Sequence, residues 1–123
     1  MAKYDIEEGS SEVSGSRFAI VAAKFNAFVV DKLLAGATET LQRHGVRDAD
    51  IDVVRVPGAF ELPLAAQRAA RGDGIRAVIV LGAVIRGGTP HFEYVCDQCA
   101  SGVMRVGLDA DMPVIFGLLT TDD

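Results

Sequence analysis

The sequence predicts an α/β protein, a three-layer α/β/α sandwich in which helices cover both faces of a four-stranded parallel sheet. Two observations point to this fold class. Four short apolar runs rich in branched residues alternate with longer segments of helical periodicity, as strands and crossover helices do in parallel sheets. The 123 residues are 50% hydrophobic and 24% charged, which suits one compact domain. The expected strands are residues 17–23, 51–56, 77–85 and 113–119.

The first two segments between these strands are predicted to be helices. From Val30 to Leu41, apolar residues recur at i, i+3, i+4, i+7 and i+11, and Gly45 follows where a helix commonly ends. The second segment has Pro63 at a position that the first turn of a helix tolerates, and an alanine-rich stretch leads to Gly72. Each helix therefore connects one expected strand to the next.

The third crossover has the clearest predicted start and contains both cysteines. Thr89 and Pro90 stand where an N-cap and a first helical residue are expected. The apolar spacing that follows places Cys96 and Cys99 on the buried stripe in mid-helix, whereas reactive thiols favour helix N-termini. We interpret both as core thiols and expect no metal site, because no second pair of residues has the spacing of a zinc site.

Charge and hydropathy exclude several classes of partner. The chain has 17 acidic and 12 basic residues, a formal net charge of -5, which disfavours nucleic acid and anionic membrane surfaces. No apolar run approaches the roughly 20 residues of a membrane-spanning helix. The acidic opening of the chain is unlike a secretory signal, so a cytoplasmic location is expected.

The two ends of the sequence differ from the predicted domain at residues 17–123. Residues 1–16 lack periodicity, and we expect them to become ordered only on a neighbouring subunit, where they can add a strand. Residues 120–123 form a cluster of N-cap types after the last strand, where a further helix is expected. Three helices over four strands leave part of one face bare, which either a neighbouring chain or further residues would cover.

The turns that follow the strands are where a ligand site is expected in an open parallel sheet. In the third turn, Gly87 and Gly88 let backbone amides approach a ligand, and Thr89 adds a hydroxyl at a helix N-terminus. The turn matches neither the P-loop nor the dinucleotide fingerprint, so one small phosphate is the expected ligand. A glycine turn shaped only for chain reversal is an equally strong interpretation of these residues alone.

Four further side chains at these turns have both a chemical and a structural interpretation. His91 can act as a general base beside the anion turn, or be a surface histidine. Phe25 and Phe60 stand outside the periodic core positions and can stack on a planar heterocycle, or simply pack. Glu61 can accept hydrogen bonds from ligand hydroxyls, although complementing the helix dipole is the default.

In order along the chain, these turns resemble the 6,7-dimethyl-8-ribityllumazine synthase family. The resemblance extends from about residue 17 to 121 and includes the closing 113–117 and 119–121 segments. It also implies a flavodoxin-like strand order. The matching motifs are Phe25-Asn26, Val56-Pro57-Gly58-Ala59-Phe60-Glu61, and Gly82-Ala83-Val84-Ile85-Arg86-Gly87-Gly88-Thr89-Pro90-His91-Phe92-Glu93-Tyr94-Val95-Cys96.

The resemblance implies an activity and a set of site residues. The family condenses 5-amino-6-(D-ribitylamino)uracil with 3,4-dihydroxy-2-butanone 4-phosphate, giving the lumazine, phosphate and water without a cofactor. By this resemblance Phe25 stacks on the pyrimidine, Gly88 and Thr89 bind phosphate, and His91 moves the protons. The implied substrate-binding residues are Phe25, Asn26, Ala59, Phe60, Glu61, Ala83, Val84, Ile85, Gly88, Thr89 and Phe116.

The resemblance also implies an assembly. Family members place the site between adjacent subunits of a homopentamer, so Phe116 would serve the neighbour's site, and some members build a 60-subunit shell. The family continues through two helices that supply a phosphate-binding arginine and a lysine, which have no counterpart before Asp123. This form is therefore expected to bind the pyrimidine better than it condenses it. The alternatives are a catalytically weak flavin- or lumazine-binding protein and a shell-forming scaffold.

Overall fold

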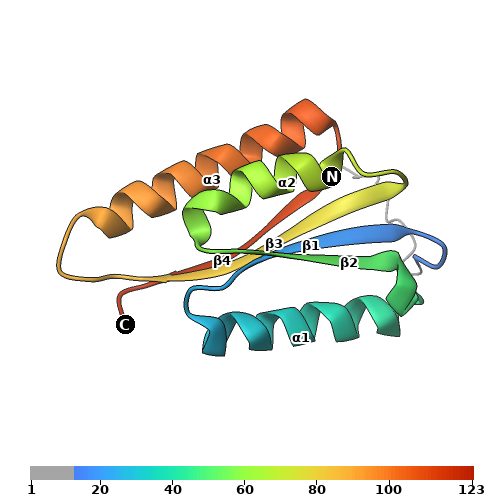
Figure 1. Ribbon diagram of the computed structural model, residues 1–123, viewed down its shortest axis with the longest axis horizontal. Helices are drawn as coiled ribbons and strands as arrows, with labels where there is room; N and C mark the ends of the chain where they lie inside the picture. The colour runs from blue at the N-terminus through green and yellow to red at the C-terminus, as the bar shows by residue number, and fades with distance from the viewer. Residues whose placement is uncertain (1–12) are drawn as a thin grey trace, which may run out of the picture.

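The computed structural model describes residues 13–123 (Figure 1). The expected ordering of residues 1–16 on a neighbour therefore lies almost entirely outside the described residues. Strands and helices alternate along the chain, with one short 3-10 turn before the second strand and another after it. The elements are β1 (Arg17–Ala23), α1 (Ala27–Arg43), η1 (Asp48–Asp50), β2 (Ile51–Val56), η2 (Ala59–Glu61), α2 (Leu62–Ala70), β3 (Ile75–Ile85), α3 (His91–Ala110) and β4 (Val114–Thr121).

The four strands form one parallel sheet in the order β2-β1-β3-β4. Helix α1 lies on one face of the sheet, and α2 and α3 lie together on the other (Figure 1). The predicted three-layer α/β/α sandwich and its strand order are confirmed. The parallel arrangement brings the carboxyl ends of all four strands to one edge of the sheet.

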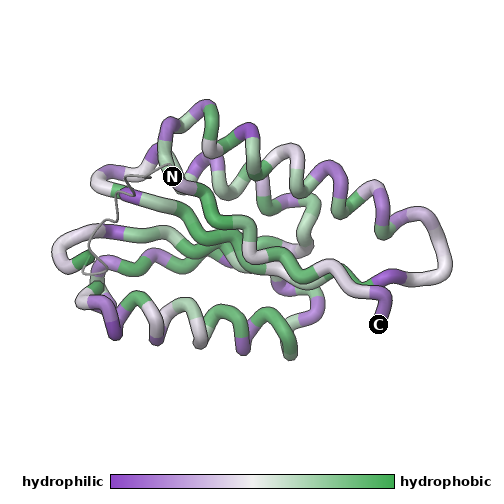
Figure 2. The backbone as a smooth tube through the Cα atoms, turned by 180° about the vertical axis from the view of Figure 1, so that it is seen from behind, coloured by the Kyte–Doolittle hydropathy of each residue, from purple (hydrophilic) through white to green (hydrophobic). Residues whose placement is uncertain are grey.

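Alternate side chains of each strand enter the two layers of the core. Ile20 and Leu81 pack toward α1 with Val30, whereas Val21 and Val80 pack toward α2 and α3. Because both faces of the central strands are buried, these strands are hydrophobic along most of their length (Figure 2). Burial of each such side chain stabilises the fold by about 1.5–3 kcal/mol.

Two glycines allow close approaches, one between neighbouring helices and one between neighbouring strands. A Cβ at Gly102 in α3 would lie 2.7 Å from two ring carbons of Pro63 in α2, so these helices pack closer there than any larger residue allows. At Gly82 in β3, a Cβ would lie 2.7 Å from a methyl carbon of Leu118. Position 102 therefore requires glycine for packing against a rigid ring, whereas a side chain at Gly82 would have to displace the end of Leu118.

Four predicted boundaries are wrong by one or two residues. β3 begins at Ile75 rather than 77. β4 begins at Val114 rather than 113 and continues to Thr121 rather than ending at 119, since Thr120 and Thr121 pair with the end of β3. These threonines belong to the sheet and do not form a turn. Helix α3 begins at His91, because the ψ angle of 1° at Pro90 is not helical.

The cysteines of α3 differ in burial. Cys99 is completely buried in the core beside α2, which confirms its interpretation as a core thiol, whereas Cys96 is only partly buried. Burial raises the pKa of Cys99 to about 11 and also raises the pKa of Cys96. Both thiols are therefore less easily ionised than a free cysteine.

Among residues 13–123, no helix covers the α1 face of the sheet over β4. Ile115 and Leu119 alternate along this face with residues that point toward α3, and both are about half exposed, as is Ile85 at the end of β3. Within the described residues, the three helices leave this part of the face uncovered, as expected. Within residues 13–123, no helix is long and apolar enough to cross a membrane.

Candidate active site

Three turns converge at the carboxyl edge of the sheet and enclose one cleft of about 500 Å³. They follow β1, β2 and β3, as expected for a ligand site in a parallel sheet. The cleft wall is mostly apolar, with two exposed aromatic rings and few polar side chains. Its lining residues are Phe25, Pro57, Gly58, Ala59, Phe60, Glu61, Ala83, Val84, Ile85, Gly87, Thr89, His91, Phe92 and Val95.

The turn after β1 holds an aromatic ring at the cleft. The backbone N–H of Phe25 donates to the carbonyl of Pro57 at 3.0 Å, so the first turn is attached to the second. The Phe25 side chain is 71% exposed. Asn26 adopts a left-handed conformation, with φ of 60°, and its side-chain amide donates to the carbonyl of Ala83 at 2.8 Å. Asn26 therefore braces the end of β3 and does not line the cleft.

The turn after β2 provides a second ring and the carboxylate of the cleft. Phe60 is 61% exposed, while its neighbour Ala59 is buried. One carboxylate oxygen of Glu61 accepts a hydrogen bond from the backbone N–H of Gly58 at 3.1 Å. This bond closes the turn and leaves the carboxylate with further acceptor capacity toward a ligand.

The turn after β3 has the expected open backbone. Gly87 and Gly88 both lack a positive φ, and a Cβ at either position would meet no atom within 4 Å. Neither chain reversal nor packing therefore requires glycine here, which removes support from the purely structural interpretation of this pair. Open space instead lets a ligand approach the backbone amides. Gly87 lines the cleft and Gly88 does not.

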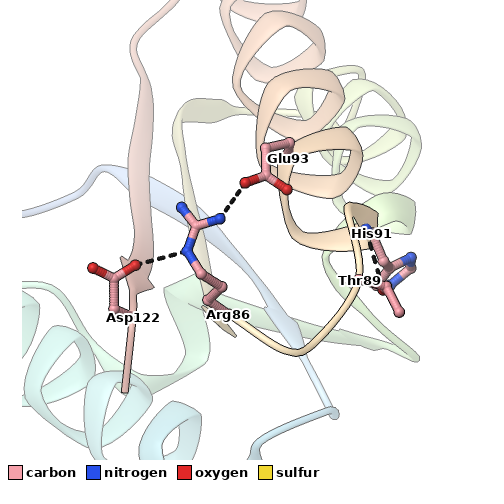
Figure 3. Close-up of polar contacts among 5 residues, drawn as sticks. All are labelled: Arg86, Thr89, His91, Glu93 and Asp122. Atoms are coloured by element: carbon pink, nitrogen blue, oxygen red, sulfur yellow. Dashed lines mark hydrogen bonds and ion pairs between the residues drawn. The ribbon is translucent and has the colours of Figure 1, made fainter.

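The first residue of α3 places an imidazole in the cleft. His91 is exposed, and its backbone N–H donates to the Thr89 hydroxyl at 3.4 Å. Phe92 and Val95 join His91 in the lining, since these residues lie within one turn of the helix. His91 and Thr89 lie together at the start of α3 (Figure 3).

An arginine at the end of β3 connects three elements beside the cleft. The Arg86 guanidinium donates to Glu93 in α3 and to Asp122 just after β4, the latter at 2.8 Å (Figure 3). The hydrogen bond from Arg86 lowers the pKa of Glu93, and the two carboxylates raise the pKa of Arg86. The sequence interpretation missed this arrangement, because only strand pairing brings Asp122 beside Arg86.

Most of the residues that the sequence predicts for the site line the cleft; the exceptions are Asn26, Gly88 and Phe116. Phe116 lies on β4, about half exposed and outside the cleft of its own chain. Gly87, which the sequence places in the anion turn, also lines the cleft. The lining residues that the prediction omitted could have been found from their turns or from the face of α3 that contains His91; they are Pro57, Gly58, Phe92 and Val95. Among the described residues, no group of three or more His, Cys, Asp or Glu could hold a metal ion.

A concave, mostly apolar cleft with a few polar groups suits a small molecule, and this places the chain among α/β proteins that act on or bind metabolites. The sequence pattern of the 6,7-dimethyl-8-ribityllumazine synthase family matches residues 15–123, and the chain belongs to this family. It is 53% identical over 115 residues to a protein of Salinibacter ruber (strain DSM 13855 / M31) that is named 6,7-dimethyl-8-ribityllumazine synthase. The match covers 94% of this chain and 74% of that protein.

Proposed function

We infer that the chain is a transferase of riboflavin biosynthesis. It condenses 5-amino-6-(D-ribitylamino)uracil with 3,4-dihydroxy-2-butanone 4-phosphate to give 6,7-dimethyl-8-ribityllumazine, phosphate and water. One observation supports this most strongly: Phe25, Phe60, Thr89 and His91, which come from three separate turns, line the same cleft. The reaction needs surfaces for a planar ring, an anion and a proton carrier within reach of one another, and these side chains provide them.

The ribitylaminopyrimidine is assigned to the aromatic side of the cleft. The exposed rings of Phe25 and Phe60 offer faces for stacking on a planar ring. Ala83, Val84 and Ile85 line the wall at the end of β3, and Glu61 can accept hydrogen bonds from ribityl hydroxyls. The ring and its polyol chain thus have separate apolar and polar partners.

The phosphate of the second substrate is assigned to the turn between β3 and α3. The first backbone amides of a 20-residue helix and the positive end of its dipole favour an anion at this position. The Thr89 hydroxyl and the open backbone at Gly87 and Gly88 add donors around it.

His91 is assigned as the group that moves protons. Imine formation, phosphate elimination and ring closure each require proton transfer, for which histidine is the side chain that enzymes use most often. His91 lines the cleft beside Gly87 and Thr89, which supports assigning the imidazole to the carbon skeleton that loses phosphate. No cofactor takes part in this proposal.

The proposed enzyme works as a cytoplasmic homopentamer, which can assemble further into a 60-subunit shell. Exposed apolar side chains on α3 and on the bare face of β4 support self-association, because a monomer rarely leaves such surface uncovered. Phe116 is about half exposed at the edge of the sheet, where it can reach the cleft of a neighbouring subunit. Residues 1–16 would become ordered on such a neighbour.

The test is to follow lumazine fluorescence with both substrates present while inorganic phosphate is added. We expect product to form, and phosphate to compete with the butanone phosphate but not with the pyrimidine. Binding of the pyrimidine without any product would instead identify a lumazine- or flavin-binding protein.

A further inference from the structure

Arg86 makes contacts at both ends of the phosphate-binding turn. Its backbone N–H donates to the carbonyl of Thr121 at 2.8 Å, and its guanidinium Nε donates to the carboxylate of Asp122 at 2.8 Å. A second guanidinium nitrogen donates to Glu93, in the first turn of α3. One side chain therefore ties the end of β3 to the end of β4 and to the start of α3 (Figure 3).

The same guanidinium also packs on the wall of the cleft. Its central carbon lies 4.3 Å from the centroid of the Phe92 ring, a cation–π distance, and Phe92 lines the cleft. Arg86 itself does not line the cleft. It therefore acts on the site from behind, through Phe92 and through the turn that it spans.

The turn needs such support because it has little of its own. Gly87 and Gly88 have no side chains to pack, and their surroundings are open. Glycine backbone also loses more conformational freedom on ordering than any other residue. Contacts at the two ends of the turn are then what can hold its amides and the Thr89 hydroxyl in one arrangement.

We propose that Arg86 is a positioning residue: through Glu93, Asp122 and Phe92 it holds the Gly87-Gly88-Thr89 turn and the start of α3 in the arrangement that binds the phosphorylated substrate. This inference rests on the proposed function for the identity of that substrate. We call the three charged groups the Arg86 clasp.

A direct role for Arg86 as the phosphate ligand is disfavoured by its surroundings. Its two donating nitrogens are occupied by two carboxylates, and the clasp as a whole has one positive and two negative charges. In Figure 3 the clasp lies on the side of the turn away from Thr89 and His91. An anion held by the clasp itself would meet net negative charge.

The test compares Arg86→Met with Arg17→Met in the full chain. Arg17 is a matched control, since it also makes two hydrogen bonds to a carboxylate, that of Asp52, and its side chain is 44% exposed against 43% for Arg86. Arg17 is the first residue of β1. It therefore lies at the amino-terminal end of this strand, whereas the cleft lies at the carboxyl ends of the strands. Three quantities are measured: KM for each substrate, kcat, and hydrogen exchange of the amides of residues 87–89.

For Arg86→Met we expect KM for the butanone phosphate to rise by about ten- to a hundredfold, because a misplaced turn holds the phosphate less well. KM for the pyrimidine should stay unchanged, and amide exchange at 87–89 should become faster. Arg86→Lys should recover only part of the loss, since an ammonium does not bridge two carboxylates with a planar fork. The Arg17→Met control should match the wild type in all three.

Unchanged KM for the butanone phosphate and unchanged exchange in Arg86→Met would overturn the clasp. Should that variant fail to fold, Glu93→Gln and Asp122→Asn decide, and each is expected to shift the same quantities in the same direction by less. If the wild type makes no lumazine, the proposed function fails, whereas amide exchange and the affinity for inorganic phosphate still test the clasp.

Discussion

At the residue scale, substitution of His91 distinguishes a catalytic site from a site that only binds its ligand. The His91 imidazole is in the cleft wall, and its backbone N–H donates to the Thr89 hydroxyl, a bond that alanine at this position could also make. We expect His91→Ala to lower turnover by about 10²- to 10⁴-fold, the usual contribution of a general acid–base group. Calorimetric affinity for the ribitylaminopyrimidine should be retained. Turnover equal to wild type would remove His91 from the proton transfers.

The cysteines of α3 give a second residue-scale prediction. Because burial raises the pKa of Cys99 to about 11, almost no thiolate is available there at pH 8. We expect iodoacetamide to leave Cys99 unmodified and to label Cys96 slowly in the folded protein, and to modify both once denaturant is added. Mass spectrometry of the peptides distinguishes the two sites. Rapid labelling of Cys99 without denaturant would show that α3 is not packed as described.

At the element scale, the sequence predicted the strands wherever a strand supplies its own apolar pattern. The start of β3 was missed because Arg76 interrupts that pattern, and Ile75 joins the sheet only by pairing with Arg17. Thr120 and Thr121 are predicted from the sequence to be N-cap types that follow the last strand, but threonine is also common within strands. Their pairing with Val84 and Ile85 decides between the two.

Like the strands, the site residues could be predicted only where a local sequence pattern identifies them. Local turn chemistry identified Phe25, Phe60, Thr89 and His91, all of which line the cleft. The Arg86 clasp depends on Asp122, which is 36 residues away in the sequence and becomes a neighbour only through the register of β3 with β4. Pairings of this kind are tertiary and leave no local pattern.

Acid should weaken the Arg86 clasp, because protonation of Glu93 removes its ion pair with Arg86. The pKa of Glu93 is lowered in the folded state by Arg86, so its stabilising effect is present above the unfolded pKa and is lost as pH falls through the folded one. We expect Glu93→Gln to melt below wild type at neutral pH. The gap in Tm should begin to narrow near about pH 4, where a glutamate without a partner is protonated, and should vanish only below the lowered folded pKa. A gap that is constant with pH would mean that the charge of Glu93 does not matter.

The packing of α2 against α3 is tested by a glycine-to-alanine substitution in α3, with the same substitution in α1 as the control. Gly102→Ala forces a Cβ against the rigid ring of Pro63 and should lower the free energy of unfolding by about 1–3 kcal/mol. Gly36→Ala, in α1, meets nothing within 4 Å and should raise it by up to about 1 kcal/mol through helix propensity. Urea denaturation measures both. Equal effects in the two helices would contradict the close approach at Pro63.

At the scale of the whole molecule, exposed apolar surface predicts self-association. Tyr94, Met104 and Leu108 are all largely exposed on α3. We expect the wild type to be oligomeric by light scattering, and Met104→Glu with Leu108→Glu to lower the observed mass, because charges would be buried without partners. Ala35→Glu adds a charge to an exposed position of α1 and serves as the control. A well-folded wild-type monomer at micromolar concentration would refute both the oligomer and the site shared between subunits.

The most direct test of the whole proposal is to measure lumazine and inorganic phosphate together in one reaction of this chain with both substrates. The condensation produces one phosphate for each lumazine, so the two should appear in equal amounts and at a rate proportional to protein concentration. His91→Ala should slow both to the same degree. If neither product exceeds the protein-free reaction while the pyrimidine still binds, the cleft is a binding site and the chain does not catalyse the condensation.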